Sequence, residues 1–375
     1  MRLPGGLTDR EFLRFVILAI LLIAASGAGM FLFLTVQYAS ESILWPNTPP
    51  VPYFTLILTT VGGLAVGLCL HVFGDHVLLL QQSLTEFRRT GRFEPQYLPA
   101  GLFTIYISLV FGASLGPEVA AIDMGGSVGT LAGDRLRSRV RALAITGIMG
   151  SLGGFGIYLF VNRTTGGALY PVPTLGEFLP VYLVYAVILG LAGAAAGVLF
   201  IAAFHIFSRV LKPVTGRYLI RGLAGGVGMG IAGTIFPLVL FSGQNEFKTV
   251  LDMGAAVGAT ILLLLVAVKI LASTWCMATL FKGGPIFPLI FAGGSLGIAF
   301  NALFPFIPLA VAVPAVMTGM IICVLKMPAA VIPIVALVFM QWEILIIIVI
   351  ATLIGYYTTR SVVMFPENKE DKGTE

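Results

Sequence analysis

Long stretches without a charged residue constrain this chain more than any other feature of its sequence. A hydrocarbon core about 30 Å thick requires roughly 20 apolar residues in a helix. Strands of a membrane barrel would alternate in polarity over about 10 residues, and these stretches do not alternate. The sequence therefore predicts an all-α polytopic membrane protein. The charge-free runs are 15–36, 51–73, 142–161, 178–207, 222–241, 253–268, 283–325 and 344–359.

The composition excludes a water-soluble globular protein, because only 10% of the residues are charged, against about 25% in soluble domains. Cys69, Cys276 and Cys323 share no spacing, so the sequence predicts no disulfide framework, no metal site and no cofactor. The first run follows Arg10 and Arg14 as a signal-peptide core would. Its length and the many later runs favour a retained first helix.

Basic residues are distributed unevenly and predict the orientation of the chain. Lys and Arg gather before the first run and in 88–92, 135–141 and 209–221, whereas 37–50 and 164–177 contain none. By the positive-inside rule, the basic segments are cytoplasmic and the other two lie on the opposite side. We expect a multi-pass protein in the lipid bilayer of the cell (plasma) membrane, with cytoplasmic N- and C-termini. The net charge of +5 reflects this orientation and indicates no nucleic-acid partner.

One motif occurs twice without a gap. Residues 116–129 and 284–297 both read Gly-Pro, seven residues and Gly-Gly-Ser-x-Gly, at an offset of 168 residues, and Gly63 and Gly222 begin a weaker echo. The arginine clusters of the first copy correspond to a stretch of the second in which only Lys248 is basic. The same element is then cytoplasmic in one copy and external in the other. This pattern predicts an inverted-topology repeat, which is typical of transporters with a site between the halves near the bilayer midplane.

These observations divide the chain into five parts. They are an N-terminal segment with the first helix, a first membrane repeat, a linking membrane helix or hairpin, a second and inverted repeat, and a short cytoplasmic tail. The predicted boundaries are 1–50, 51–177, 178–214, 215–360 and 361–375.

Each Gly-Pro pair is predicted to open a helix, because Gly permits the turn and Pro at the first helical position loses no needed hydrogen bond. If the two helix starts point inward from opposite sides, unpaired N–H groups and positive dipole ends converge on one buried place. Such a place attracts an anion without Lys or Arg.

Glu118 lies in the first turn of the first such helix, within an apolar part of the chain. An ionisable residue there is costly and is a functional candidate. Its carboxylate could occupy the anion site and leave when protonated or displaced, which would make it a gate. The alternative is a simple helix cap, and the burial favours the gate. Asp123 falls on a different helical face, and a packing or polar contact is expected for it.

At these residues the sequence resembles the CLC family of chloride channels and proton-coupled chloride transporters. That family has a GxEGP motif, whose glutamate is the gate, and a GxFxP motif in its second half. Residues 116–120 keep the Gly and Glu of the first motif, and 284–288 keep the Gly and final Pro of the second. The resemblance covers about 55–358. It implies a CLC-like fold, with broken or re-entrant helices meeting near the membrane midplane, and a homodimer.

The resemblance also implies which residues surround the ion. Counting back from Glu118 places Val77 where the family has an anion-contacting serine, and Met364 stands for a tyrosine, with Tyr356 and Tyr357 nearby. Lys282 could raise the local potential for anions. The expected anion-binding residues are Gly116, Pro117, Val119, Gly284, Ile286, Phe287 and Val77, and the possible pore residues are Met364, Tyr356, Tyr357 and Lys282.

The predicted function is transmembrane transport of chloride or another small anion, not enzymatic catalysis. A passive pathway is favoured over proton exchange, because no carboxylate occurs between Asp134 and Glu177, where family exchangers carry a second glutamate. Two alternatives remain: a proton-coupled anion antiporter, or a degenerate member with another solute or a structural role. Lys269 and Lys326 lie near run edges, where snorkelling and pore-lining fit equally.

Overall fold

The structure is a computed structural model that describes residues 9–46, 51, 53–76, 78–136, 140–161, 169–170 and 172–365. These residues form fourteen α-helices and four short 3₁₀ helices. The described residues contain one isolated β-bridge, between Gly116 and Gly284, so the predicted all-α class is confirmed. The α-helices are α1 (Asp9–Leu44), α2 (Phe54–Phe73), α3 (Leu80–Thr90), α4 (Leu98–Val110), α5 (Glu118–Arg135), α6 (Val140–Val161), α7 (Val181–Val210), α8 (Tyr218–Ile235), α9 (Gln244–Met253), α10 (Ala259–Ala278), α11 (Ile286–Leu303), α12 (Leu309–Leu325), α13 (Pro328–Phe339) and α14 (Leu345–Thr359). The 3₁₀ helices are η1 (Pro95–Tyr97), η2 (Lys212–Val214), η3 (Pro237–Val239) and η4 (Gly254–Val257).

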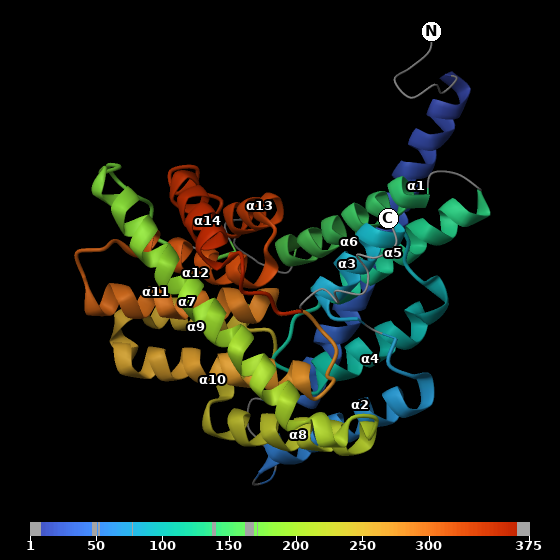
Figure 1. Ribbon diagram of the computed structural model, residues 1–375, viewed down its shortest axis with the longest axis horizontal. Coiled ribbons are helices and arrows are strands. Elements are labelled where there is room, and N and C mark those ends of the chain that lie inside the picture. Colours follow the sequence, from blue (N-terminus) through green and yellow to red (C-terminus); the bar gives the residue numbers. More distant parts are fainter. Residues whose placement is uncertain are drawn as a thin grey trace.

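The helices follow the same order in two halves of the chain, α2 to α6 and then α8 to α12. The helix before each half packs against the last helix of that half: α1 against α6, and α7 against α12. Figure 1 shows α4 to α6 toward the right and α9 to α12 toward the left. The repeat predicted from the doubled motif is therefore visible in the helix order. No sequence echo had indicated that α1 and α7 hold equivalent places.

The two halves meet along α2 and α8, which lie side by side at the bottom of Figure 1. A Cβ atom added to Gly63 would lie 2.2 Å from the carbonyl oxygen of Gly222, and one added to Gly222 would lie 2.2 Å from the carbonyl oxygen of Gly63. The contact is therefore reciprocal, and the two backbones touch without side chains between them. Small residues allow this close approach between helices in a membrane.

We expect Gly63→Ala to destabilise the protein by about 1–3 kcal/mol, because the new methyl group meets backbone atoms of α8 that cannot move aside. Gly153→Ala is the matched control, since a Cβ at this position of α6 has no neighbour within 4 Å. Thermal unfolding of both variants in one detergent makes the comparison. If the two proteins unfold at the same temperature, the reciprocal contact of α2 and α8 is wrong.

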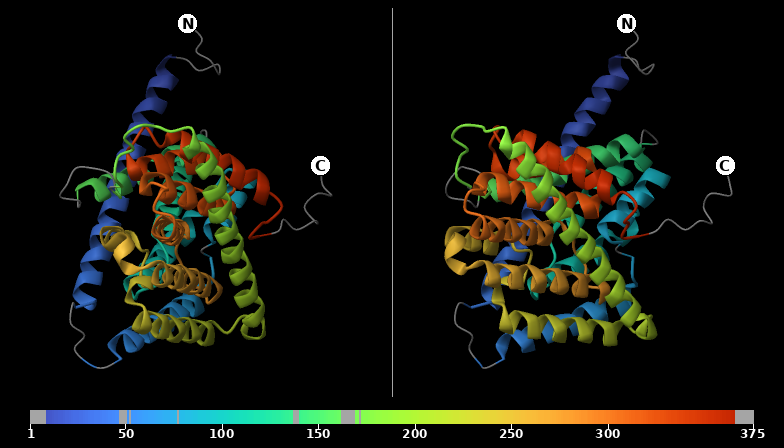
Figure 2. Two further views of the ribbon diagram at one scale, coloured as in Figure 1. Left: turned by 90° about the vertical axis from the view of Figure 1, so that its left-hand side faces the viewer. Right: turned by 60° about the vertical axis from the view of Figure 1, so that its left-hand side comes forward.

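Seven helices of the described residues are long and apolar enough to span a membrane: the α1 part Leu13–Leu44, α2, α6, α7, α8, α10 and α11. The N-terminal part of α1 extends beyond the other helices in Figure 2, and its exposed side chains include Leu13, Ile17 and Leu21. Exposed apolar side chains of this kind suit a lipid environment. The run 283–325, which has no charged residue, forms two helices, because Pro305 and Pro308 lie in the turn between α11 and α12.

Lys269 is buried, which corrects the two roles expected for it. The predicted run ended at residue 268, but α10 continues through Lys269, whose exposed fraction is 0%. Its Nζ donates to the carbonyl oxygens of Val239, Leu240 and Phe241 at 3.1, 3.4 and 2.9 Å, and it lies 4.9 Å from the ring centre of Phe291. Lys269 therefore neither snorkels nor lines a pore. It satisfies the carbonyl groups of the turn after α8.

Candidate anion-binding site

The two Gly-Pro pairs lie next to each other in the interior of the protein. Pro117 precedes α5 and Pro285 precedes α11, so both helices begin at this place, as the motif predicted. Gly116 and Gly284 form an antiparallel β-bridge in which each N–H donates to the other carbonyl oxygen at 2.8 Å. The two segments are far apart in sequence, and this bridge holds the two helix starts together.

The carboxylate of Glu118 lies at the beginning of α11, although the residue belongs to α5. Its exposed fraction is 3%. The backbone N–H of Ile286 donates to Oε1 of Glu118 at 2.5 Å, and the backbone N–H of Phe287 faces the same carboxylate. The first N–H groups of a helix have no partner within the helix and carry its positive dipole end. A negative group from one helix therefore occupies the anion-attracting start of the other.

The second oxygen of this carboxylate, Oε2, is buried and has no hydrogen-bond partner among the residues that the structure describes. An unsatisfied buried acceptor costs about 1–3 kcal/mol. The carboxylate is thus held by backbone N–H groups, whereas its oxygen Oε2 has no hydrogen-bond partner among the described residues. This combination suits a group that leaves its place more readily than a fully bonded cap would.

The space around the carboxylate exists because two positions lack side chains. A Cβ atom at Gly116 would lie 2.0 Å from Oε2 of Glu118, and one at Gly284 would lie 2.3 Å from Oε1. The ring of Phe287 would lie 3.0 Å from a Cβ atom at Gly116, and it packs edge to face against Phe155, with ring centres 5.4 Å apart. The glycines of the motif are therefore required by close approach, and the space is that of one carboxylate group.

A cavity of about 550 Å³ lies between α3, η1, α4 and α5. Its lining includes Asp75, Arg92, Phe93 and Asp123, and Asp123 accepts a hydrogen bond from Ser83 at 3.5 Å, which is the polar contact expected for it. The cavity therefore runs along the helix that begins with Glu118.

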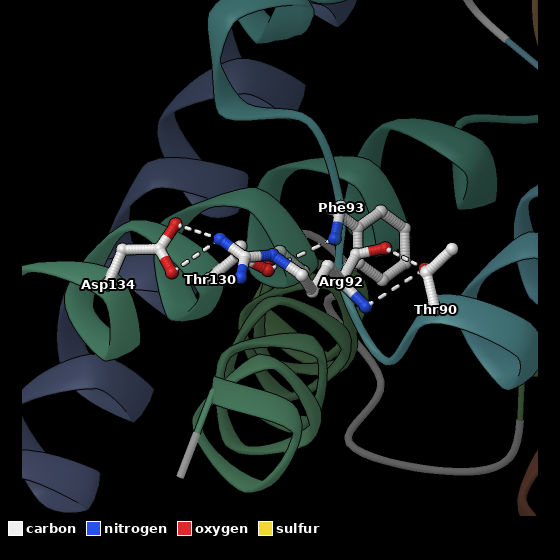
Figure 3. Close-up of polar contacts among 6 residues, drawn as sticks. Thr90, Arg92, Phe93, Thr130 and Asp134 are labelled. Carbon is white, nitrogen blue, oxygen red and sulfur yellow. Dashed lines mark hydrogen bonds and ion pairs between the residues drawn. The ribbon is translucent and has the colours of Figure 1, made fainter. Parts of the chain in front are cut away.

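The wall of this cavity is fastened to α5, as Figure 3 shows. Both outer oxygens of Asp134 accept hydrogen bonds from Nη2 of Arg92, at 2.5 and 2.6 Å, and the N–H of Phe93 donates to the hydroxyl of Thr130 at 3.1 Å. The hydroxyl of Thr90 joins the two ends of the turn, because it accepts from the N–H of Arg92 and donates to its carbonyl oxygen. The segment after α3 is therefore fixed to the helix that carries Glu118.

A much smaller crevice lies beside the segment that precedes α5. It is lined by residues that include Leu115, Pro117, Glu41 and Glu246, from α1, α9 and the segment before α5. A crevice of about 10 Å³ therefore lies beside the start of α5, near the C-terminal part of α1.

The remaining predicted site residues fall into three groups. Val119 is buried in the first turn of α5, beside Glu118. Val77 lies outside the described residues. Met364 is buried and its carbonyl oxygen lies 2.7 Å from Nε2 of His205, whereas Tyr356 and Tyr357 pack against each other near the end of α14. A pore role for these three residues stays a prediction.

Lys282 lies near the site but is paired with an acid. Its Nζ forms an ion pair with Oδ1 of Asp75 at 2.5 Å, and its side chain is 5% exposed. Its backbone N–H donates to the hydroxyl of Ser108 at 2.9 Å. Sequence reasoning identified Lys282 but missed Asp75, which is 207 residues away. The available signal was that each is an isolated charge beside a long apolar run.

Comparisons with known proteins agree with this arrangement. A family model described as "Voltage gated chloride channel" matches residues 140–360. The chain is 25% identical over 353 residues to "Putative ion-transport protein YfeO" of Salmonella schwarzengrund, covering 81% of this chain and 85% of that protein. It is 24% identical over 362 residues to the protein of the same name from Escherichia fergusonii, covering 82% of this chain and 86% of that protein.

Two solved structures share the fold. One is a CLC-type fluoride/proton antiporter, with a TM-score of 0.76, 14% identity and coverage of 96% of this chain and 98% of that one. The other is a slow cyanobacterial Cl⁻/H⁺ antiporter, with a TM-score of 0.78, 17% identity and coverage of 92% and 94%. These likenesses confirm the fold predicted from the doubled Gly-Pro motif.

Proposed function

Because the chain belongs to the voltage gated chloride channel family, we propose that it moves a small anion across a membrane through the site around Glu118. The observation that supports this most directly is the hydrogen bond from the backbone N–H of Ile286 to the Glu118 carboxylate. A carboxylate at the start of a helix occupies the place that a free anion would take. Glu118 is then the gate, and its side chain must leave before an anion can enter.

The backbone supplies the charge that the anion needs. The beginnings of α5 and α11 lie around one buried position. The residues at the beginning of α5 are Gly116, Pro117 and Val119, and those at the beginning of α11 are Gly284, Ile286 and Phe287. Backbone N–H groups bind a halide without the strong attraction of a lysine, which would slow its release. The cavity along α5 and the crevice beside Pro117 are the proposed approaches to this position.

The proposal is tested by measuring anion efflux from liposomes that contain the purified full-length protein. The two solved structures above are described as fluoride/proton and Cl⁻/H⁺ antiporters, so fluoride, chloride, bromide and nitrate form the test series. With valinomycin present to balance charge with K⁺, we expect at least one of these anions to leave faster than from protein-free liposomes. Equal efflux with and without protein for all four anions would overturn the proposal.

Proton-coupled exchange is the second candidate, because two carboxylates, those of Glu41 and Glu246, line the crevice next to Pro117. Carboxylates beside a gate can carry protons to it. The same liposomes decide between the candidates when a pH gradient is imposed without an anion gradient. Uphill anion movement indicates exchange, and its absence in liposomes that show efflux indicates a passive pathway.

The orientation and assembly are part of the same proposal. With the arginines of 88–92 and 209–221 in the cytoplasm, the N- and C-termini are cytoplasmic in the plasma membrane. We also propose a homodimer in which each subunit has its own pathway. Labelling of an Arg88→Cys variant from one side of intact cells tests the orientation, and the mass of the detergent-solubilised protein tests the dimer.

A further inference from the structure

The cavity between α3, η1, α4 and α5 has the size of a site for a small organic molecule. Its volume is about 550 Å³, and pockets that bind organic ligands in proteins span roughly 300–1,000 Å³. A cavity needs only about 10–15 Å³ to hold one water molecule, so this one is far larger than a single small ion requires. Its lining side chains indicate which class of molecule it accepts.

The lining of the cavity is predominantly acidic. Its acids are Asp75, Glu86, Glu94 and Asp123, and Arg92 is the arginine among the described lining residues. Three of these five charges already belong to ion pairs: Asp75 with Lys282, Glu86 with Arg89, and Arg92 with Asp134. Glu94 and Asp123 form no ion pair within the described part of the chain. The uncompensated charge of the cavity is therefore negative, and it attracts a cation.

The inner wall of the cavity offers two oxygen acceptors from one face of α5. Asp123 and Ser127 are four residues apart, so their side chains are neighbours on the helix, and both line the cavity. Ser127 is 3% exposed, and its hydroxyl has no hydrogen-bond partner among the residues described. Buried hydroxyls usually have one. An ammonium group, which carries up to three N–H donors, can bond both oxygens at once.

Asp123 has weak partners within the protein. Its contact with the hydroxyl of Ser83 is long, at 3.5 Å. The ammonium group of Lys282 is within electrostatic range of Asp123, but its ion pair is with Asp75. The carboxylate of Asp123 therefore keeps capacity for a ligand that enters the cavity.

Aromatic side chains form another part of the lining and favour an organic cation over a metal ion. The rings of His76 and Tyr97 are stacked, with centres 3.7 Å apart and planes 9° apart, and Phe93 also lines the cavity. Aromatic faces attract organic cations. A metal ion would instead need several ligating side chains close together, and the described residues contain no group of three or more His, Cys, Asp or Glu that could hold one.

We infer that this cavity binds a small organic amine in its ammonium form. The N–H groups of the amine bond Asp123 and Ser127, and its carbon chain lies against the aromatic part of the lining. Glu94, which is exposed, adds attraction for the positive charge. The regulatory consequence rests on the proposed function: because the cavity is a proposed approach to Glu118, a bound amine slows anion efflux.

The test measures calorimetrically the binding of butylammonium to the purified full-length protein, in detergent and an amine-free phosphate buffer. Butyrate, an anion of similar length, and Mg²⁺ are titrated in parallel. Butylammonium should bind, and Asp123→Asn should weaken it about tenfold or more, because a hydrogen bond to a charged group is lost. Asp252→Asn is the matched control, since Asp252 is an exposed acid of α9, and it should bind as the wild type does.

Three results would overturn the amine site. They are butylammonium binding that is absent or equal in the wild type and Asp123→Asn, butyrate binding that Asp123→Asn alters, and Mg²⁺ that displaces butylammonium and binds more tightly. The last result would indicate a metal site instead.

Two further variants keep the inference testable if Asp123→Asn folds poorly. Ser127→Ala removes the second acceptor and Tyr97→Leu removes an aromatic face, so each should weaken butylammonium binding severalfold. A ligand that binds the folded protein raises its unfolding temperature, so butylammonium should stabilise the wild type more than either variant. Equal binding and equal stabilisation in all three proteins would contradict the site.

The amine site and the proposed function can fail separately. If no anion leaves the liposomes but butylammonium binds through Asp123, the transport proposal is wrong and the amine site stands. If efflux occurs and butylammonium does not bind, only the amine site is wrong. Binding through Asp123 that leaves efflux unchanged would overturn the regulatory consequence.

Discussion

Glu118→Ala should increase chloride efflux from liposomes and tighten chloride binding about tenfold or more. The Glu118 carboxylate occupies the proposed anion position and accepts a charge-assisted hydrogen bond from the N–H of Ile286. Such a bond contributes about 1.5–3 kcal/mol. A difference of about 1.4 kcal/mol changes a binding constant tenfold. Removal of the side chain therefore removes the competitor, and ion-selective electrodes together with calorimetry measure the two effects.

Glu118→Gln separates charge from occupancy. The glutamine has nearly the same size, and its amide oxygen can still accept from the N–H of Ile286, but it carries no charge. Its efflux should lie between those of the wild type and Glu118→Ala. Glu343→Ala is the matched control, because Glu343 is an exposed acid outside the helices. If Glu118→Ala and Glu343→Ala behave alike, Glu118 is a helix cap and not a gate.

Lys269→Met should lower the free energy of unfolding by about 2–4 kcal/mol, because the methionine leaves the carbonyl groups of Val239, Leu240 and Phe241 without their donor. The side chains have similar length, so the loss reflects hydrogen bonding more than packing. Unfolding by heat or by denaturant in detergent measures the change.

Lys248→Met provides the control, since Lys248 is exposed on α9 and its replacement should change the stability by no more than about 0.5 kcal/mol. A Lys269→Met protein as stable as Lys248→Met would mean that other groups bond these carbonyls.

The two helix beginnings in the candidate site could be predicted, because each is signalled by residues that are adjacent in the sequence. A Gly-Pro pair dictates where a helix begins, and the second copy of the motif indicated a second beginning. That the two beginnings meet, with Glu118 of one bound to Ile286 of the other, follows from the repeat only if the copies are inverted, which the arginine distribution indicated. Here the prediction and the structure agree.

Other features could not be predicted, because they depend on contacts between distant residues. Asp75 and Lys282 are each an isolated charge, and nothing in the spacing of the sequence joins them. Lys269 follows a charge-free run, which suggested that a helix ends there. In the structure its buried ammonium group is stabilised by hydrogen bonds to carbonyl groups of a turn about 30 residues away, which the sequence does not indicate. The helices α1 and α7 hold equivalent places but share no sequence motif, because helices that face lipid and pack against other helices need only small and apolar residues.

The paired hydrogen bonds between Gly116 and Gly284 limit how this protein can work. A carrier that rocks one half against the other would have to shear these two bonds in every cycle, and the matching contact of Gly63 with Gly222 would resist the same motion. We therefore expect a nearly rigid scaffold in which turnover involves only swings of side chains. Distances between spin labels on the two halves should then stay constant whether or not ions are flowing.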